Sequence, residues 1–182
     1  MYARFLTLII WGCSIALFQM SCSSNRFSHE INSIDSLISV LDSAHYKLNL
    51  LDTAVIQSSY DIYVKNIEQI REAFEEKKDD EVWKVLTRYG LLRKPLRDFQ
   101  KYYKKFSQEI DFSRMQLLNL KSDIKDNILD EAKIKMYMKE EAEFVKYIML
   151  SVSNLMDMTQ NYFNQYLELN PQIEKLLIED KI

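Results

Sequence analysis

Residues 134–169 read IKMYMKEEAEFVKYIMLSVSNLMDMTQNYFNQYLEL, without a glycine or a proline. Mainly apolar side chains recur in this stretch at alternating steps of four and three, which places them on one side of an α-helix. They are Ile134, Met138, Glu141, Val145, Ile148, Val152, Leu155, Thr159, Tyr162, Tyr166 and Leu169. A second row lies beside the first, at Ala142, Met149, Met156 and Phe163. Two adjacent rows are wider than the seam of a two-stranded coiled coil, so we expect this helix to pack against at least two others.

The same spacing recurs in the rest of the chain. The middle row is Leu96, Phe99, Tyr103, Phe106, Ile110, Ser113, Leu117, Leu120 and Ile124, prolonged upstream by Val82, Leu86 and Tyr89. The first row is Phe27, Ile31, Ile34, Ile38, Leu41, His45 and Leu48, which then drifts through Val55, Ile62, Ile67, Ile70 and Phe74. Strict alternation of apolar and polar residues, the mark of a half-buried strand, is missing from all three segments. The sequence therefore predicts an all-α fold.

Helix breakers and capping residues divide this pattern into three long helices. Lys77-Lys78-Asp79-Asp80 is a polar break in which either aspartate could cap the next helix, and Asp126-Asn127 is a second break before a capping Asp130. Asn170-Pro171 is expected to close the third helix, because the residue before a proline disfavours α geometry. A further short helical turn over 172–180 follows.

The expected architecture is an up-down-up bundle of these three helices, since short connections favour antiparallel neighbours. Pro95 removes a backbone donor and should kink the middle helix. A break of the first helix near Ser58-Ser59 would give a four-helix bundle instead.

Composition excludes several classes of protein. The 182 residues include only two glycines and two prolines, too few for a sheet rich in tight turns or for a glycine-rich phosphate loop. The net charge of -3 is unlike the basic excess of general nucleic-acid binders. We therefore expect no nucleic acid among the partners.

The first residues differ from everything that follows. Met1-Tyr2-Ala3-Arg4 carries one positive charge, and residues 5–18 are uncharged and rich in leucine and isoleucine. A basic start, a short apolar stretch and a small residue before a cut are typical of a secretory signal peptide. An uncleaved anchor is the alternative, although a membrane-spanning helix needs about 20 apolar residues.

The end of this stretch, Gln19-Met20-Ser21-Cys22, resembles the lipobox of bacterial lipoproteins. The resemblance implies cleavage after Ser21 and attachment of a diacylglycerol to the thiol of Cys22, which becomes the acylated N-terminus. Gln19 departs from the usual aliphatic residue, as in the tolerant lipobox of Bacteroidota. Ser23 after the cysteine implies the outer membrane by the common sorting rule, with the bundle facing the periplasm. The resemblance covers about 25 residues and implies no activity.

This interpretation divides the chain into three parts. Residues 1–21 form the signal peptide, 22–30 the lipidated cysteine with a polar tether, and 31–182 the helical bundle. Both cysteines, Cys13 and Cys22, lie at this N-terminal end, so the bundle holds no disulfide and no catalytic thiol.

Metal-binding and cofactor motifs are not evident in the bundle. His45 lies on the apolar row and reads as a half-buried core residue rather than a ligand, since no Glu-x-x-His motif accompanies it. Met136-x-Met138 and Met156-x-Met158 resemble copper ligands only in composition. Residues two apart on a helix point in different directions, so core filling is the better interpretation. We expect no metal and no cofactor.

The charges are distributed unevenly. A basic face is predicted on the middle helix at Lys94, Arg97, Lys101, Lys104 and Lys105. It could contact an anionic surface or an acidic partner. The favoured interpretation is instead that it pairs within the chain with an acidic stretch that precedes the middle helix: Glu68, Glu72, Glu75, Glu76, Asp79, Asp80 and Glu81.

The expected function is that of a non-enzymatic lipoprotein, tethered to a membrane of the cell envelope, that binds another envelope protein as an adaptor or scaffold. The alternative is a periplasmic carrier that holds an apolar ligand between helices near Tyr162, Phe163 and Tyr166. An enzyme is the least favoured class, because no set of residues indicates a catalytic site.

Overall fold

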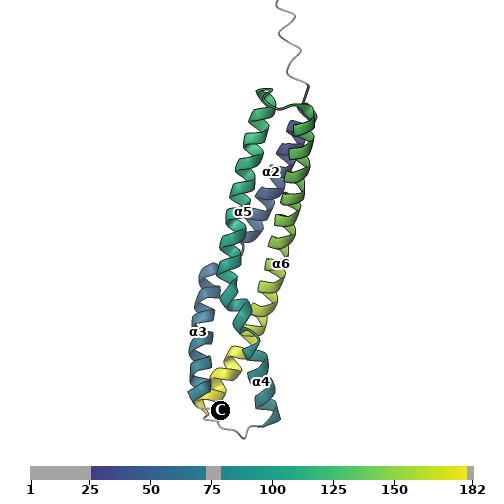
Figure 1. Ribbon diagram of the computed structural model, residues 1–182. Coiled ribbons are helices and arrows are strands. Elements are labelled where there is room, and N and C mark those ends of the chain that lie inside the picture. The colour runs from purple at the N-terminus through teal and green to yellow at the C-terminus, as the bar shows by residue number, and fades with distance from the viewer. Residues whose placement is uncertain (1–25, 73–78, 180–182) are drawn as a thin grey trace, which may run out of the picture.

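The computed structural model describes residues 26–72 and 79–179, nearly all of them helical (Figure 1). The expected lipid site and its surroundings, including Cys22, lie outside these residues. The helices are α2 (Ser28–Asn49), α3 (Thr53–Glu72), α4 (Asp80–Gly90), α5 (Arg93–Lys125) and α6 (Glu131–Ile178). The described residues contain no strand, which confirms the all-α prediction for this part of the chain.

The chain passes along the molecule three times. Helices α2 and α3 follow one another in one direction, α4 and α5 return, and α6 spans the length again (Figure 1). The expectation of three helices is therefore wrong in number, because the first and the middle helix are each divided in two. Residues 28–30, which were expected to belong to a polar tether, form the first turn of α2.

Asp52 causes the break between α2 and α3. Its carboxylate accepts hydrogen bonds from the backbone N–H groups of Ala54 and Val55, at 3.1 and 3.0 Å, and so caps the start of α3. The alternative that the first helix breaks near Ser58-Ser59 is wrong in position, since the break lies at residues 50–52. Both serine hydroxyls donate to the Val55 carbonyl at 2.9 Å inside the continuous helix, an arrangement that helices tolerate.

The middle helix is interrupted at Leu91-Leu92 rather than kinked at Pro95. Helix α4 ends at Gly90 and α5 begins at Arg93, which places Pro95 in the first turn of α5. Backbone N–H groups in the first turn of a helix have no intrahelical acceptor. A proline in this turn therefore breaks no helical hydrogen bond.

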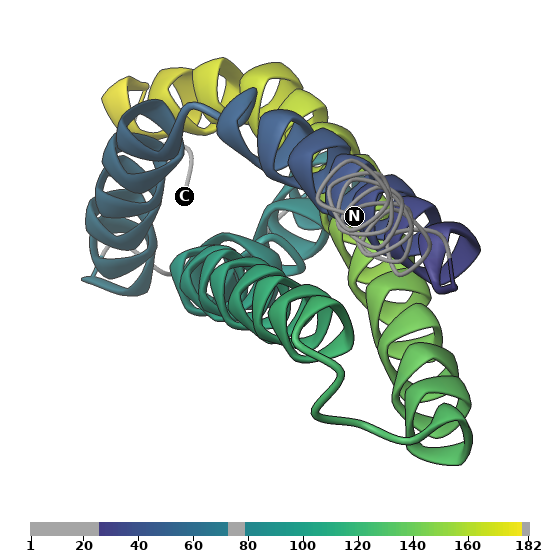
Figure 2. The ribbon, with the colours of Figure 1, turned by 90° about the horizontal axis from the view of Figure 1, so that it is seen from above.

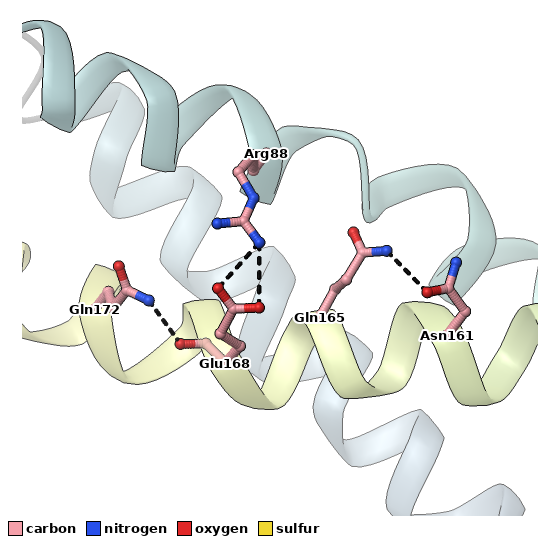
Figure 3. A network of polar contacts seen from close by, with 5 residues as sticks. All are labelled: Arg88, Asn161, Gln165, Glu168 and Gln172. Atoms are coloured by element: carbon pink, nitrogen blue, oxygen red, sulfur yellow. Dashed lines mark hydrogen bonds and ion pairs between the residues drawn. The ribbon is translucent and has the colours of Figure 1, made fainter.

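Pro171 does not end α6, contrary to the sequence-based expectation. The helix continues to Ile178, and Leu169 and Ile173 on either side of the proline are fully buried. Gln172 Nε2 donates to the Glu168 carbonyl at 3.0 Å, which satisfies a backbone acceptor in the turn before the proline (Figure 3). Burial of the flanking residues offsets the backbone hydrogen bond to the Leu167 carbonyl that proline cannot make.

The two predicted aspartate caps are confirmed. Asp79 accepts from the Glu81 N–H at the start of α4, and Asp130 accepts from the Lys133 N–H at 2.9 Å at the start of α6. Asn127, at the predicted break between α5 and α6, adopts a left-handed conformation with φ 54°.

Helices α2, α5 and α6 surround a common apolar interior in one half of the molecule (Figures 1 and 2). The members of the predicted α5 and α6 rows are buried or half-buried except Ala142, which is exposed. The row predicted beyond the first break is wrong at Val55 and Ile62, which are exposed. The buried residues of α3 are instead Ile56, Ser59, Tyr63 and Asn66, because the interruption at 50–52 changes the register of the helix.

A buried polar network joins α3, α4 and α6 in the other half. The hydroxyl of Tyr89 donates to Asn170 Oδ1 at 2.8 Å, and Asn66 Nδ2 donates to the same oxygen at 3.0 Å. Asn170 Nδ2 in turn donates to Glu174 at 2.8 Å. Buried polar groups need such partners, so this network fixes how α4 sits against the two longer helices.

None of the described helices combines the length and the apolar character that are needed to cross a membrane.

Candidate functional site

The outer face of α5 carries the basic residues that the sequence singled out. The core row of α5 occupies one side of the helix, and Lys94, Arg97, Lys101, Lys104 and Lys105 lie on the opposite side, all exposed. We call these five residues the basic face. The structure thus brings together every member that the sequence predicted.

Two members of the basic face are held by neighbours. Arg97 Nε donates to Asp98 at 2.8 Å, and this hydrogen bond is the main cause that lowers the pKa of the Asp98 carboxyl. Lys105 Nζ donates to the Tyr147 hydroxyl of α6 at 3.3 Å and lies 3.7 Å from Glu109. The bond to Tyr147 and the charge of Glu109 raise the pKa of Lys105.

The other three cations are open to a ligand or partner. Lys94, Lys101 and Lys104 form no ion pair with any residue that the structure describes. The expected pairing with the acidic stretch does not form at Glu68, Glu72 or residues 79–81, whose side chains point into solvent. Glu75 and Glu76 lie outside the described residues. Residues 79–81 lie at the start of α4, and the rest of this helix comes between them and the start of α5. The acidic residues and the basic face, which were expected side by side, are therefore apart.

Exposed apolar residues continue the same side of α5. Phe112 follows Lys105 by seven residues and Met115 follows Lys104 by eleven, spacings that return to the same side of a helix. Their exposed fractions are 51% and 54%. Sequence reasoning missed them because it examined only the buried rows; extending the basic row by the same spacing would have found them. The outer face of α5 therefore carries basic residues in its first half, followed by the exposed apolar residues Phe112 and Met115.

A cavity of about 270 Å³ lies between the start of α5 and the middle of α6, with one wall from α3. We call it the α5–α6 cavity. Its lining is mostly apolar and aromatic: Ile56, Lys94, Pro95, Leu96, Asp98, Phe99, Tyr102, Leu155, Met158, Thr159, Tyr162 and Phe163. Tyr162 and Phe163 were expected beside an apolar ligand. Tyr166, expected with them, is buried one turn further along and does not line the cavity.

The residues considered as metal ligands lie apart. His45 is half-buried on α2, as expected of a core residue. Met136 is exposed while Met138 is half-buried, so the two thioethers point in different directions. Within residues 26–72 and 79–179, no group of three or more histidine, cysteine and acidic side chains is arranged to hold a metal ion.

Comparison of the chain with protein-family models, with curated proteins and with solved structures gave no match.

Proposed function

We propose that this protein is a cell-envelope lipoprotein, tethered through Cys22, whose bundle binds an acidic protein partner and catalyses no reaction. The lipobox-like end of the apolar N-terminal stretch supports the tether. By the sorting rule, Ser23 favours the outer membrane with the bundle in the periplasm.

The observation that carries the adaptor role is the outer face of α5. Three exposed lysines without ion-pair partners give this face a positive potential that attracts acidic surfaces. The adjoining Phe112 and Met115 supply exposed apolar area of the kind that is enriched at protein interfaces. A basic region that steers the encounter beside an apolar region that is buried on contact is a combination suited to protein binding.

Site-specific photocrosslinking in intact cells tests this role. A photoreactive amino acid replaces the exposed Gln108, which lies between the basic and the apolar half of the outer face, and Ser39 on α2 serves as the control position. We expect a crosslink to one envelope protein from position 108 and none from position 39. The crosslinked peptide of the partner should be acidic.

Charge reversal provides the second comparison. Lys101→Glu with Lys104→Glu should reduce the crosslink at position 108 at least fivefold, because two attractive charges become repulsive. Lys65→Glu with Lys146→Glu changes the net charge equally at exposed positions elsewhere and should leave the crosslink unchanged. A crosslink that survives reversal of the basic face, or the absence of any crosslink from position 108, would contradict the proposal.

A further inference from the structure

The α5–α6 cavity has the size and lining of a site for one narrow apolar chain. Its volume of about 270 Å³ exceeds the roughly 150 Å³ of an engineered apolar cavity that binds benzene. It stays just below the range of about 300–1,000 Å³ that is typical of pockets for drug-sized ligands. Phe99, Tyr102 and Tyr162 contribute aromatic surface to its walls. A lipid with two acyl chains is too large for this space.

The mouth of the cavity is positively charged. Lys94 lines it without an ion pair, and Lys101 lies seven residues further along the same side of α5. Asp98 also lines the cavity, but Arg97 engages both of its carboxylate oxygens, at 2.8 and 3.3 Å. Of the charged residues that line the cavity, Asp98 is therefore paired by Arg97, and the Lys94 ammonium group has no ion pair of its own.

The start of α5 adds to this potential. Leu92 precedes the helix and provides no side-chain cap, so the positive end of the helix dipole is not neutralised there. Lys94 lies in the first turn of this helix, next to the cavity. The apolar walls of the cavity and the positive charge of Lys94 are therefore adjacent at the start of α5.

We propose that the α5–α6 cavity binds a single-chain anionic amphiphile, with its apolar chain among the aromatic rings and its carboxylate or phosphate beside Lys94. The cavity adjoins the basic face of the proposed adaptor role and shares Lys94 with it, but it does not include Lys104, Phe112 or Met115. A fatty acid and a lysophospholipid share the required chemistry of one acyl chain and an anionic head.

Photoaffinity capture by the full-length protein in isolated membranes tests the site. Three probes carry the same eight-carbon chain, short enough for the cavity, with a diazirine at mid-chain: a carboxylic acid, a 1-acyl glycerol phosphate and a neutral alcohol. Crosslinked peptides are mapped by mass spectrometry, so a probe in the cavity is distinguished from acyl groups at the N-terminus. We expect crosslinks at cavity residues such as Tyr102 and Tyr162 with the anionic probes, and at least fivefold less capture of the alcohol. Capture of one anionic probe over the other identifies the head group.

Two pairs of variants locate the head and the chain. Lys94→Glu should reduce capture of the anionic probes to the level of the alcohol, whereas Lys104→Glu, on the same face but outside the cavity, should not. Thr159→Trp fills the cavity and should abolish capture of every probe. Asn154→Trp, an exposed position of α6 outside the cavity, is its control.

Three results would overturn the proposal: equal capture of alcohol and acid, crosslinks that map outside the cavity, or capture that survives Thr159→Trp. The melting temperature of each variant shows whether it is folded. If Thr159→Trp does not fold, the comparison of Lys94→Glu with Lys104→Glu still decides the matter, because both positions are exposed.

Discussion

Glu141 is the one charged residue on the predicted core row of α6, and its position has an energetic consequence. One of its carboxylate oxygens is buried without a hydrogen-bond partner. Burial, together with the charge of Glu140, raises the pKa of the Glu141 carboxyl above its ordinary value of 4.5. The folded protein thus holds this proton more tightly than the unfolded chain does. Protonation of the Glu141 carboxyl therefore stabilises the folded protein at low pH. This stabilisation is lost as the pH rises through the pKa of the carboxyl in the folded protein.

Glu141→Gln should therefore stabilise the protein at pH 7 relative to wild type and change little at pH 4. Thermal unfolding at the two pH values measures the difference. Glu143→Gln, at an exposed position two residues away, should show no such dependence on pH. An equal effect of Glu141→Gln at both pH values would mean that its carboxyl is well solvated.

Ile148 tests the core register at a single position. Its side chain is fully buried among apolar neighbours. Ile148→Asp places a charge there without a partner and should cost several kcal/mol, a large part of the total stability of about 5–15 kcal/mol. Leu150→Asp, at an exposed position two residues on, should change the stability by less than about 0.5 kcal/mol. Equal urea midpoints for the two variants would show that the register is wrong.

At the scale of the elements, α4 is held by contacts of very different strength. Arg88 Nη2 contacts both carboxylate oxygens of Glu168 at 3.0 and 3.1 Å, but both side chains are exposed (Figure 3). Exposed ion pairs contribute about 0–1 kcal/mol. The network around Asn170 joins α4 to the same helix through buried side chains, so the loss of its central acceptor leaves a buried donor unsatisfied.

Asn170→Ala should therefore destabilise the protein far more than Arg88→Ala. The asparagine variant removes the acceptor of the buried Tyr89 hydroxyl, at about 1–3 kcal/mol for a buried unpaired group, and leaves the Asn66 amide only its longer hydrogen bond to that hydroxyl, at 3.3 Å. Hydrogen exchange of α4 amides measures the local effect, and urea unfolding measures the global one. Similar losses for the two variants would contradict the assigned importance of the network.

Gly90 ends α4 without using the conformational freedom of glycine. The structure gives it no positive φ, and an added Cβ would meet no atom within 4 Å. Gly90→Ala should stabilise the protein by about 0.4–1 kcal/mol, mainly because the unfolded chain loses freedom. The Gly90 carbonyl would still accept from the Tyr63 hydroxyl. A lower melting temperature would mean that the break between α4 and α5 requires glycine.

The rows of α5 and α6 could be predicted because burial imposes a helical spacing on apolar residues, and long helices repeat that spacing many times. The breaks could not be predicted equally well. Asp52 caps α3, yet an aspartate between apolar residues also suits an exposed position in a continuous helix. Pro171 misled the prediction because its flanking residues are held by tertiary contacts, which a local rule does not include.

For the whole molecule, the basic face could be read from spacing alone, since charged residues on one side of an amphipathic helix face solvent. That three of its lysines lack ion-pair partners within the described residues could not be predicted, because it depends on how α4 separates the acidic residues from α5. The α5–α6 cavity was foreseen only through two of its aromatic residues. Its other walls come from helices far apart in the sequence, which only the fold brings together.

An adaptor that acts at a membrane requires an anchor, so acylation of Cys22 is the claim on which the proposed function depends most. Metabolic labelling with an alkyne-bearing fatty acid, comparing wild type with Cys22→Ala, tests it directly. We predict label on the wild-type protein and none on the variant, with both proteins present in similar amounts. Label on neither protein, or equal label on both, would contradict a lipid anchor at this residue.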